Sequence, residues 1–479
     1  MSLNHGINTY KSETDFAAVK EAAVGIPFFI GAWPCHTAKG YTGKPQLANS
    51  FTEAKELGGY STDWRDTDGA PKWNLCQAMY SHFRLFGVAP AIFYNIFDPS
   101  KHKTSVTAAT MTVADHMVKL PLETIDSATL VVKTTDSSPA TLKKDKDYEV
   151  YYDDKNCIVE LLTDSTSYTK TELSIGYDKA NPSAITASDI EAAVEAVEMC
   201  KSIVGIVPDL ICAPGWSSTP SVAAVMAAKA ANINGIYKAK AVVDIDTSAS
   251  GADDYSEVLA YKNSKGYTDE NMIVCWPLVK SGDYVFDLSA VVCGLIASVD
   301  SDNADCPYES PSNKSISITG ACTKAGGEIA LSLPQADVIS YTAGVVTVLN
   351  NGGWVLWGNY TGCFPKSADV SRAFICTSRM QDFLCNTFVD TFWGYIDKPL
   401  TRVLIDSIVN SYNSWLNGLT HEGKLYGGEI QYIAENNPTA NLIGGKFRLD
   451  TKMASPVPAQ EINMYVEYDV DYLTAALNI

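Results

Sequence analysis

Few residues of this chain have the types and spacing that catalysis needs. A serine triad requires a histidine close to a serine on a tight turn and to a carboxylate, and the 479 residues include only six histidines. No serine stands in a G-x-S-x-G pattern, and the nearest approach, Gly215-Trp216-Ser217, lacks the second glycine. We interpret this tripeptide as a structural turn that ends a strand.

The zinc and nucleotide motifs are also incomplete. His421-Glu422 begins like a zinc-protease helix, but Leu425 stands where the second histidine ligand is needed. Lys44 precedes Pro45 instead of the serine or threonine of a phosphate-binding loop. Neither motif therefore predicts a ligand site.

Three closely spaced carboxylates are the remaining candidate for a cation site. Asp300, Asp302 and Asp305 offer the oxygen ligands that hard cations prefer, but the glycine and the distal glutamate of a calcium loop are missing. We interpret them as a solvated acidic loop. The sequence thus predicts no catalytic residue, no metal site and no cofactor.

Composition and charge narrow the class of protein. Hydrophobic residues make up 46% and charged residues 19%, which is typical of a folded chain. The net charge of −19 argues against nucleic acid and anionic membrane surfaces as partners. Twelve cysteines without a C-x-x-C pair indicate reduced core residues. With no signal-like or membrane-spanning segment, we expect a soluble protein that folds in a reducing cytoplasm.

Helical and strand-like patterns alternate between residues 186 and 299, which predicts a parallel α/β sheet. Ser188 and Glu191 have the spacing of a capping box that opens the first helix. Proline in Ser218-Thr219-Pro220 suits the first turn of a second helix. The predicted strands are 25–33, 90–97, 209–213, 237–244 and 272–276, and the predicted helices are 51–57, 73–86, 188–204, a helix beginning at 220, 255–263 and 288–299.

Two other regions differ from this one in composition and pattern. Residues 100–181 are rich in Thr, Ser, Asp and Lys, and strand-like runs at 129–133, 148–152 and 158–162 with a turn at 153–156 predict a small antiparallel β module. Later in the chain, Asn350-Asn351-Gly352-Gly353 predicts a turn within the apolar run 345–357.

The last part of the chain combines helix and strand patterns. Apolar residues at intervals of three or four predict an amphipathic helix over 400–419. Strand-like runs follow at 429–433, 446–449 and 462–470, whereas the first dozen residues are polar and predict a mobile arm.

Four stretches, in this order, resemble the contractile tail sheath proteins of phage tails, R-type bacteriocins and related injection machines. They are a strand ending in A-P-G within 207–217, a loop with an aromatic residue and a proline at 307–314, a glycine run leading into W-G-x-x-T at 350–361, and the module from Phe374 to Gly428. The chain departs from the pattern at Tyr360, where many sheaths have arginine, and keeps only Arg379 of a common arginine pair.

The resemblance implies an α+β multidomain fold. We expect a subtilisin-like α/β sheath domain without protease chemistry, an inserted antiparallel β module and an α+β C-terminal domain. The expected segments are an N-terminal arm (1–20), the first part of the sheath domain (21–99), the inserted β-rich domain (100–181), the subtilisin-like sheath domain (182–363) and the C-terminal domain with a terminal strand arm (364–479).

The resemblance also implies that terminal arms pair with strands of adjacent subunits by β-augmentation. The arm residues expected in these contacts are Leu3, Ile7, Tyr10, Ile462, Met464, Val466, Tyr468 and Val470. The residues expected in the acceptor strands are Ile430, Tyr432, Phe447 and Leu449.

The function that the resemblance implies is structural, not enzymatic. Copies of the chain would polymerise helically around a tail tube, and contraction would drive the tube through a target envelope. Expected partners are the chain itself, the tube protein, and baseplate and tail terminator proteins, in a virion tail or phage-tail-like particle assembled in a bacterial cytoplasm. Two alternatives are a degenerate subtilisin-like hydrolase and a non-contractile capsid or surface-lattice protein.

Overall fold

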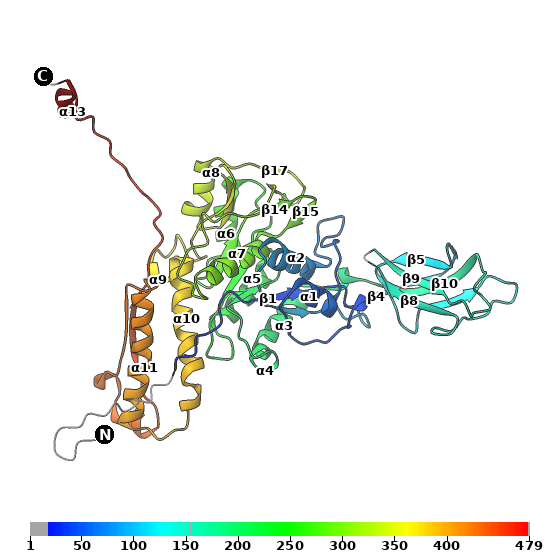
Figure 1. Ribbon diagram of the computed structural model, residues 1–479, viewed down its shortest axis with the longest axis horizontal. Helices are drawn as coiled ribbons and strands as arrows, with labels where there is room; N and C mark the ends of the chain where they lie inside the picture. Colours follow the sequence, from blue (N-terminus) through cyan, green and yellow to red (C-terminus); the bar gives the residue numbers. More distant parts are fainter. Residues whose placement is uncertain (1–17, 154, 478–479) are drawn as a thin grey trace, which may run out of the picture.

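A six-stranded sheet forms the centre of the computed structural model, which describes residues 18–153 and 155–477 (Figure 1). The strand order is β13-β12-β11-β1-β3-β2, with all neighbours parallel except the β3–β2 pair. The strands are β1 (Pro27–Gly31), β2 (Gln46–Ala48), β3 (Ala91–Asn95), β11 (Leu210–Cys212), β12 (Lys240–Asp244) and β13 (Met272–Cys275). Apolar runs predicted each parallel strand because such strands are buried on both faces.

Helices cover both faces of this sheet. The pair α3 (Ala187–Val194) and α5 (Pro220–Ala231) packs on one side, and the pair α2 (Asn74–Tyr80) and α7 (Leu288–Asp302) packs on the other. Two further helices, α1 (Phe51–Gly58) and α6 (Val258–Lys265), lie at the positions that the sequence predicted. The helix that begins at Pro220 is confirmed, with Thr219 as its N-cap.

The predicted start of α3 is wrong by two residues. The capping box is formed by Thr186 and Asp189, not by Ser188 and Glu191: the Thr186 hydroxyl accepts a hydrogen bond from the Asp189 N–H, and the Thr186 N–H donates to Asp189 Oδ2 at 2.8 Å. The predicted continuous helix is also broken. A 3₁₀ segment (Glu195–Met199) separates α3 from α4 (Cys200–Ile203).

An antiparallel β region projects from the central body (Figure 1). Its strands form two sheets around a hydrophobic cluster of their own and include the three predicted strand-like runs. They are β4 (Lys103–Thr112), β5 (Met117–Pro121), β6 (Thr124–Ile125), β7 (Val131–Thr134), β8 (Tyr148–Tyr152), β9 (Asn156–Leu161) and β10 (Glu172–Ala180). Since β4 and β10 pair along their length, the chain leaves and re-enters the body at adjacent points.

A smaller layer follows β13. It contains a four-stranded antiparallel sheet, the helix α8 and the hairpin β18–β19 at the position predicted from Asn350-Asn351-Gly352-Gly353. The elements are β14 (Leu278–Ser281), β15 (Tyr284–Phe286), β16 (Gly320–Cys322), β17 (Glu328–Ile329), α8 (Leu333–Asp337), β18 (Thr347–Asn350) and β19 (Trp354–Trp357).

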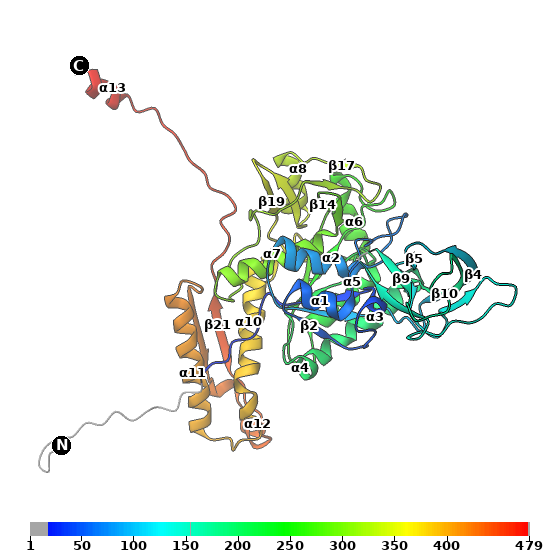
Figure 2. The same ribbon diagram turned by 45° about the vertical axis from the view of Figure 1, so that its right-hand side comes forward.

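Two long helices and a β-hairpin form the C-terminal region (Figure 2). The predicted amphipathic helix is confirmed as α11 (Arg402–His421), which packs against α10 (Ile375–Phe392) and β20 (Gly427–Gln431). Short helices α9 (Val370–Ala373) and α12 (Thr439–Ile443) complete this region. Phe374, directly before α10, forms one isolated antiparallel bridge with Tyr360.

Two strand predictions near the C-terminus are wrong for the isolated chain. The strand that pairs with β20 is β21 (Asp450–Ala454), which begins after the predicted run 446–449. Residues 462–469 adopt no regular structure, and α13 (Val470–Leu477) follows them. The molecule is therefore a mixed α+β chain of several packed regions, with a C-terminal extension that points away from its body (Figures 1 and 2).

Candidate functional site

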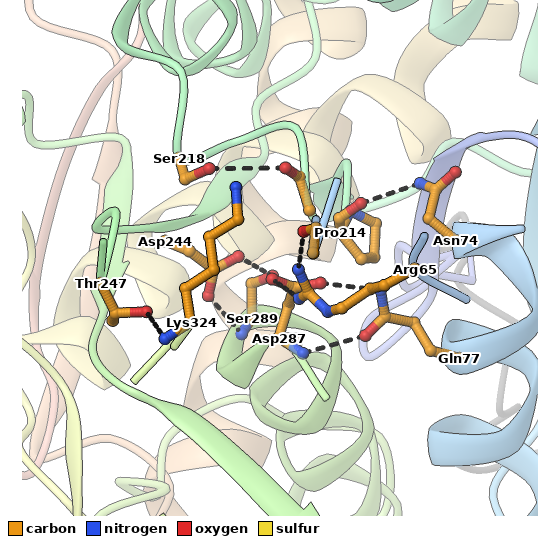
Figure 3. Close-up of polar contacts among 12 residues, drawn as sticks. Arg65, Asn74, Gln77, Pro214, Ser218, Asp244, Thr247, Asp287, Ser289 and Lys324 are labelled. Atoms are coloured by element: carbon orange, nitrogen blue, oxygen red, sulfur yellow. Dashed lines mark hydrogen bonds and ion pairs between the residues drawn. The ribbon is translucent and has the colours of Figure 1, made fainter. Parts of the chain in front are cut away.

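The carboxyl edge of the central sheet is where open α/β folds usually bind ligands, at the point where the strand order reverses. Here that edge holds a buried polar cluster (Figure 3). Asp244, at the end of β12, accepts hydrogen bonds from the Ser217 hydroxyl at 2.9 Å and from the Ser289 hydroxyl at 2.5 Å. The Ser289 N–H also donates to Asp244 Oδ1. Burial, reinforced by the nearby Asp287, raises the pKa of Asp244 to about 7.

A second carboxylate in the cluster is held by a cation. Asp287, just before α7, forms an ion pair with Arg65 at 2.5 Å and accepts a hydrogen bond from the Gln77 side-chain amide at 2.7 Å. The Gln77 carbonyl in turn accepts from the Asp287 N–H. Each acidic side chain of this cluster therefore has partners from separate elements, which tie α2, β12 and α7 together.

This geometry is that of an internal network and not of a nucleophilic site. Ser217 and Ser289 donate to a carboxylate, whereas an activated serine donates to a basic nitrogen. No hydrogen bond joins a histidine to this cluster among residues 18–153 and 155–477. In the same residues, no group of three or more His, Cys, Asp and Glu side chains is placed to hold a metal ion.

A buried ion-pair junction links the α/β body to the C-terminal region. Arg379 of α10 contacts Asp300 at 2.9 and 2.5 Å and Asp209 at 2.5 Å, and the three side chains are at most 10% exposed. Asp209 also accepts a hydrogen bond from the Ile26 N–H. The interpretation of Asp300 as part of a solvated loop was therefore wrong: Asp302 and Asp305 are exposed, but Asp300 lies inside α7.

The N-terminal strap, defined here as residues 18–26, runs from this junction along α10. The Thr387 hydroxyl accepts a hydrogen bond from the Ala22 N–H, and the Thr391 hydroxyl accepts one from the Lys20 N–H. The two threonines are four residues apart on α10 and so lie on one face of the helix. The predicted arm residues Leu3, Ile7 and Tyr10 precede this strap and lie outside the described residues.

The C-terminal arm, defined as residues 461–477, is the most exposed apolar segment of the described chain. The side chains of Ile462, Met464, Val466, Tyr468 and Val470 are between 58% and 87% exposed. Soluble monomers rarely leave so many neighbouring apolar side chains in water, and such surfaces usually mark interaction sites. The arm is therefore a candidate interface.

Gln460 fixes the point at which the arm leaves the body. Its side-chain carbonyl accepts a hydrogen bond from the Tyr360 hydroxyl at 2.8 Å, and its amide donates to Asn359 Oδ1 at 3.0 Å. Tyr360, the residue that replaces an arginine of the family pattern, is itself held by stacking on Phe364. No feature of the sequence pointed to this anchor, because Gln460 and Tyr360 are a hundred residues apart.

The predicted acceptor residues are divided between two environments. Ile430 lies in β20 with its side chain buried against α11, and Tyr432 follows directly after that strand. Phe447 and Leu449 precede β21 and pack on the apolar cluster of α10 and α11. Since β20 and β21 form a sheet of only two strands, each has one edge without a strand partner in the described chain.

Curated sequences and solved structures that resemble this chain are the same kind of protein. No family model matches the chain. The tail sheath protein of Burkholderia phage BcepMu is 25% identical over 98% of this chain and 97% of its own length. A putative prophage major tail sheath protein of Pseudomonas aeruginosa is 24% identical over 62% of this chain and 74% of its own length.

Solved structures show the same fold at low sequence identity. The contracted helical sheath of the anti-feeding prophage superposes with a TM-score of 0.58 at 13% identity, covering 98% of this chain and 100% of that one. The contracted sheath of an extracellular contractile injection system, PVC, gives a TM-score of 0.57, also at 13% identity, covering 98% and 100% of the two chains.

Proposed function

Because this chain is similar to contractile tail sheath proteins over nearly its whole length, we propose that it is the structural subunit of a sheath that polymerises helically and contracts. The observation that carries the proposal is the exposed apolar C-terminal arm on a chain that matches sheath proteins over nearly its whole length. Heterologous contacts between copies generate open helical lattices, which is the geometry that a sheath requires.

We propose that the C-terminal arm adds to the β20–β21 sheet of an adjacent copy. Backbone groups at a sheet edge can pair with an extended segment, and residues 462–468 place apolar side chains at every second position. The arm carries four acidic residues and no lysine or arginine. The acceptor segment 444–454 carries three basic residues and one acidic residue, and its exposed basic residues are Lys446, Arg448 and Lys452.

The Arg379 junction suits a subunit that moves as one body. It joins α7, α10, the N-terminal strap and Asp209, the residue directly before β11, through side chains that are shielded from water. Bending would then concentrate directly beyond Gln460, where residues 461–469 adopt no regular structure. In this proposal the energy for contraction comes from contacts between copies, which are rearranged from one lattice to another.

We also propose the domain identities and the partners that the similarity to sheath proteins suggests. The body is a subtilisin-like sheath domain, and the projecting β region of residues 100–181 is an inserted domain. The tail tube, baseplate and tail terminator proteins are the other partners, in a virion tail or phage-tail-like particle assembled in a bacterial cytoplasm. The closed Asp244 cluster gives no support to the hydrolase alternative.

Truncation after Gln460 tests the role of the arm. The shortened chain keeps every element of the body, so we expect a folded monomer that forms no tubes in negative-stain electron micrographs. The full-length chain, prepared in parallel, should polymerise. Tubes of normal appearance from the truncated chain would refute the proposed arm contact.

A further inference from the structure

The last described helix has an apolar face that no other described residue of its chain covers. Val470, Leu473 and Leu477 stand at positions i, i+3 and i+7 of α13, and all three side chains are 44% to 59% exposed. A helix of eight residues is marginal in water, because most helical stability in proteins comes from packing of one face. The sequence of α13 therefore fits a helix that is stabilised by a surface elsewhere.

An apolar groove lies in the C-terminal region. Its volume is about 440 Å³, within the range of pockets that hold small ligands. Leu384 and Phe388 of α10, Tyr412 of α11, and Phe447 and Leu449 are among the residues that line it. Ile236, which is 39% exposed, lies at its border. We name this cavity the α10–α11 groove.

Charge and position connect the groove with the arm. Lys238 lines the groove, while Asp469 and Asp471 stand at the start of α13. Phe447 and Leu449, which line the groove, lead directly into β21, so the groove adjoins the sheet to which the arm is proposed to add. Ten residue steps separate Gln460 from Val470, which allows a reach of about 33 Å in extended conformation.

We propose that α13 docks in the α10–α11 groove of a second copy of this chain, with Leu473 and Leu477 against its apolar walls. This inference rests on the proposed function and adds to it a helix contact beyond the strand contact. The occupant is a second copy because the arm leaves its own body at Gln460 and points away from it (Figures 1 and 2).

Docking of α13 would fix the register in which residues 462–468 pair with the acceptor sheet. The alternating side chains of those residues do not fix it by themselves. Side chains alternate along residues 462–468, so a shift of two residues leaves the same apolar face toward the acceptor. Such a shift moves the arm by about 6.8 Å along the strand direction. A helix that fits one groove excludes the shifted pairings, and every copy in the lattice is then linked at the same distance.

Cross-linking through a native cysteine tests the contact. Cys385 lines the groove and is the exposed cysteine of the chain, whereas the other eleven are buried. We expect the full-length Leu473→Cys variant, assembled and treated with a short bismaleimide, to form covalent dimers and larger multimers that Cys385→Ser abolishes. Ala475→Cys, on the opposite face of α13, is the matched control and should cross-link several-fold less.

The possible outcomes separate the inference from the proposed function. A cross-link confined to single chains would mean that α13 occupies the groove of its own copy, and equal cross-linking at both positions would mean that it has no preferred face; either result overturns the inference. Tubes without any cross-link would overturn the inference alone. Failure of the full-length chain to form tubes would overturn the proposed function, and the inference with it.

Two exposed isoleucines supply a test without chemical modification. Ile236→Glu adds a charge at the groove that repels the acidic arm, so it should raise the protein concentration needed for tube formation several-fold. Ile203→Glu, at an exposed isoleucine that does not line the groove, should leave that concentration unchanged. Truncation after Asp469 removes α13 but keeps the strand portion, and assembly at wild-type concentrations by this chain would contradict the docking.

Discussion

Replacement of Arg379 by methionine should destabilise the folded subunit more than any other removal of one positive charge. The substitution keeps most of the side-chain volume but deletes the cation shared by Asp300 and Asp209. Both carboxylates would remain where they are, because Asp300 lies within α7 and Asp209 holds the N–H of Ile26. The change therefore leaves two buried acids without their counter-charge.

The expected loss in the free energy of unfolding follows from the burial of the three side chains. Their exposed fractions are 4%, 1% and 10%, so water cannot replace the guanidinium. Breaking a buried ion pair by removing one partner typically costs about 3–5 kcal/mol. Burial already raises the pKa of Asp300 to about 6 although Arg379 opposes the shift, so uptake of a proton near neutral pH should keep the loss toward the lower end of that range.

Urea unfolding of the chain truncated after Gln460, with and without Arg379→Met, measures this loss. Arg402→Met is the matched control, because Arg402 is 72% exposed and pairs with Asp406 four residues away on α11, a contact worth about 0.3–0.5 kcal/mol. Adding Asp300→Asn to Arg379→Met should recover part of the stability, since it removes one uncompensated charge. A loss below about 1 kcal/mol for Arg379→Met, the range of exposed pairs, would refute the reasoning.

Three further predictions concern pH, thiols and salt. Burial raises the pKa of Asp244 from 3.8 to about 7, so between these pH values the folded state binds a proton that the unfolded state has released. The free energy of unfolding should therefore fall as the pH rises from 4 to 7, and Asp244→Asn should flatten this dependence; an unchanged dependence in the variant would contradict the role of Asp244. A thiol reagent should modify Cys385 in the native chain and all twelve cysteines in denaturant. Rapid modification of several cysteines in the native chain would contradict the burial of the other eleven. Added sodium chloride should raise the concentration needed for assembly, because the acidic arm and the basic segment 444–454 attract each other, and assembly that does not respond to salt would exclude this attraction.

Periodic patterns predicted the elements whose burial is regular. The five parallel strands of the central sheet lie in largely apolar runs, and α11 repeats its apolar residues every three or four positions, so these elements could be located from the sequence. The edge strand β2 (Gln46–Ala48) is short and only partly buried, and the sequence did not predict it. The strand β21 could not, because Asp450–Ala454 shows no clear alternation and forms by pairing with β20. The capping box was misplaced because two candidate pairs overlap within six residues of sequence.

The buried polar clusters could not be predicted, because they join residues that are far apart in the sequence. Asp300 shares a short acidic stretch with Asp302 and Asp305, and its cation lies 79 residues away at Arg379. The Asp244 cluster joins residues from three separate elements, and no short motif encodes such a meeting. The resemblance to contractile tail sheath proteins, in contrast, could be inferred from the order of four weak motifs, and the comparisons confirm that resemblance.

The most direct test is a helical reconstruction by electron cryomicroscopy of tubes formed by the full-length chain. We expect residues 461–477 of each copy to lie on another copy, with the extended part along the β20–β21 sheet and α13 in the α10–α11 groove. Density that follows the arm back onto its own body, or tubes in which the arm touches no other copy, would contradict the claim that this segment links the subunits.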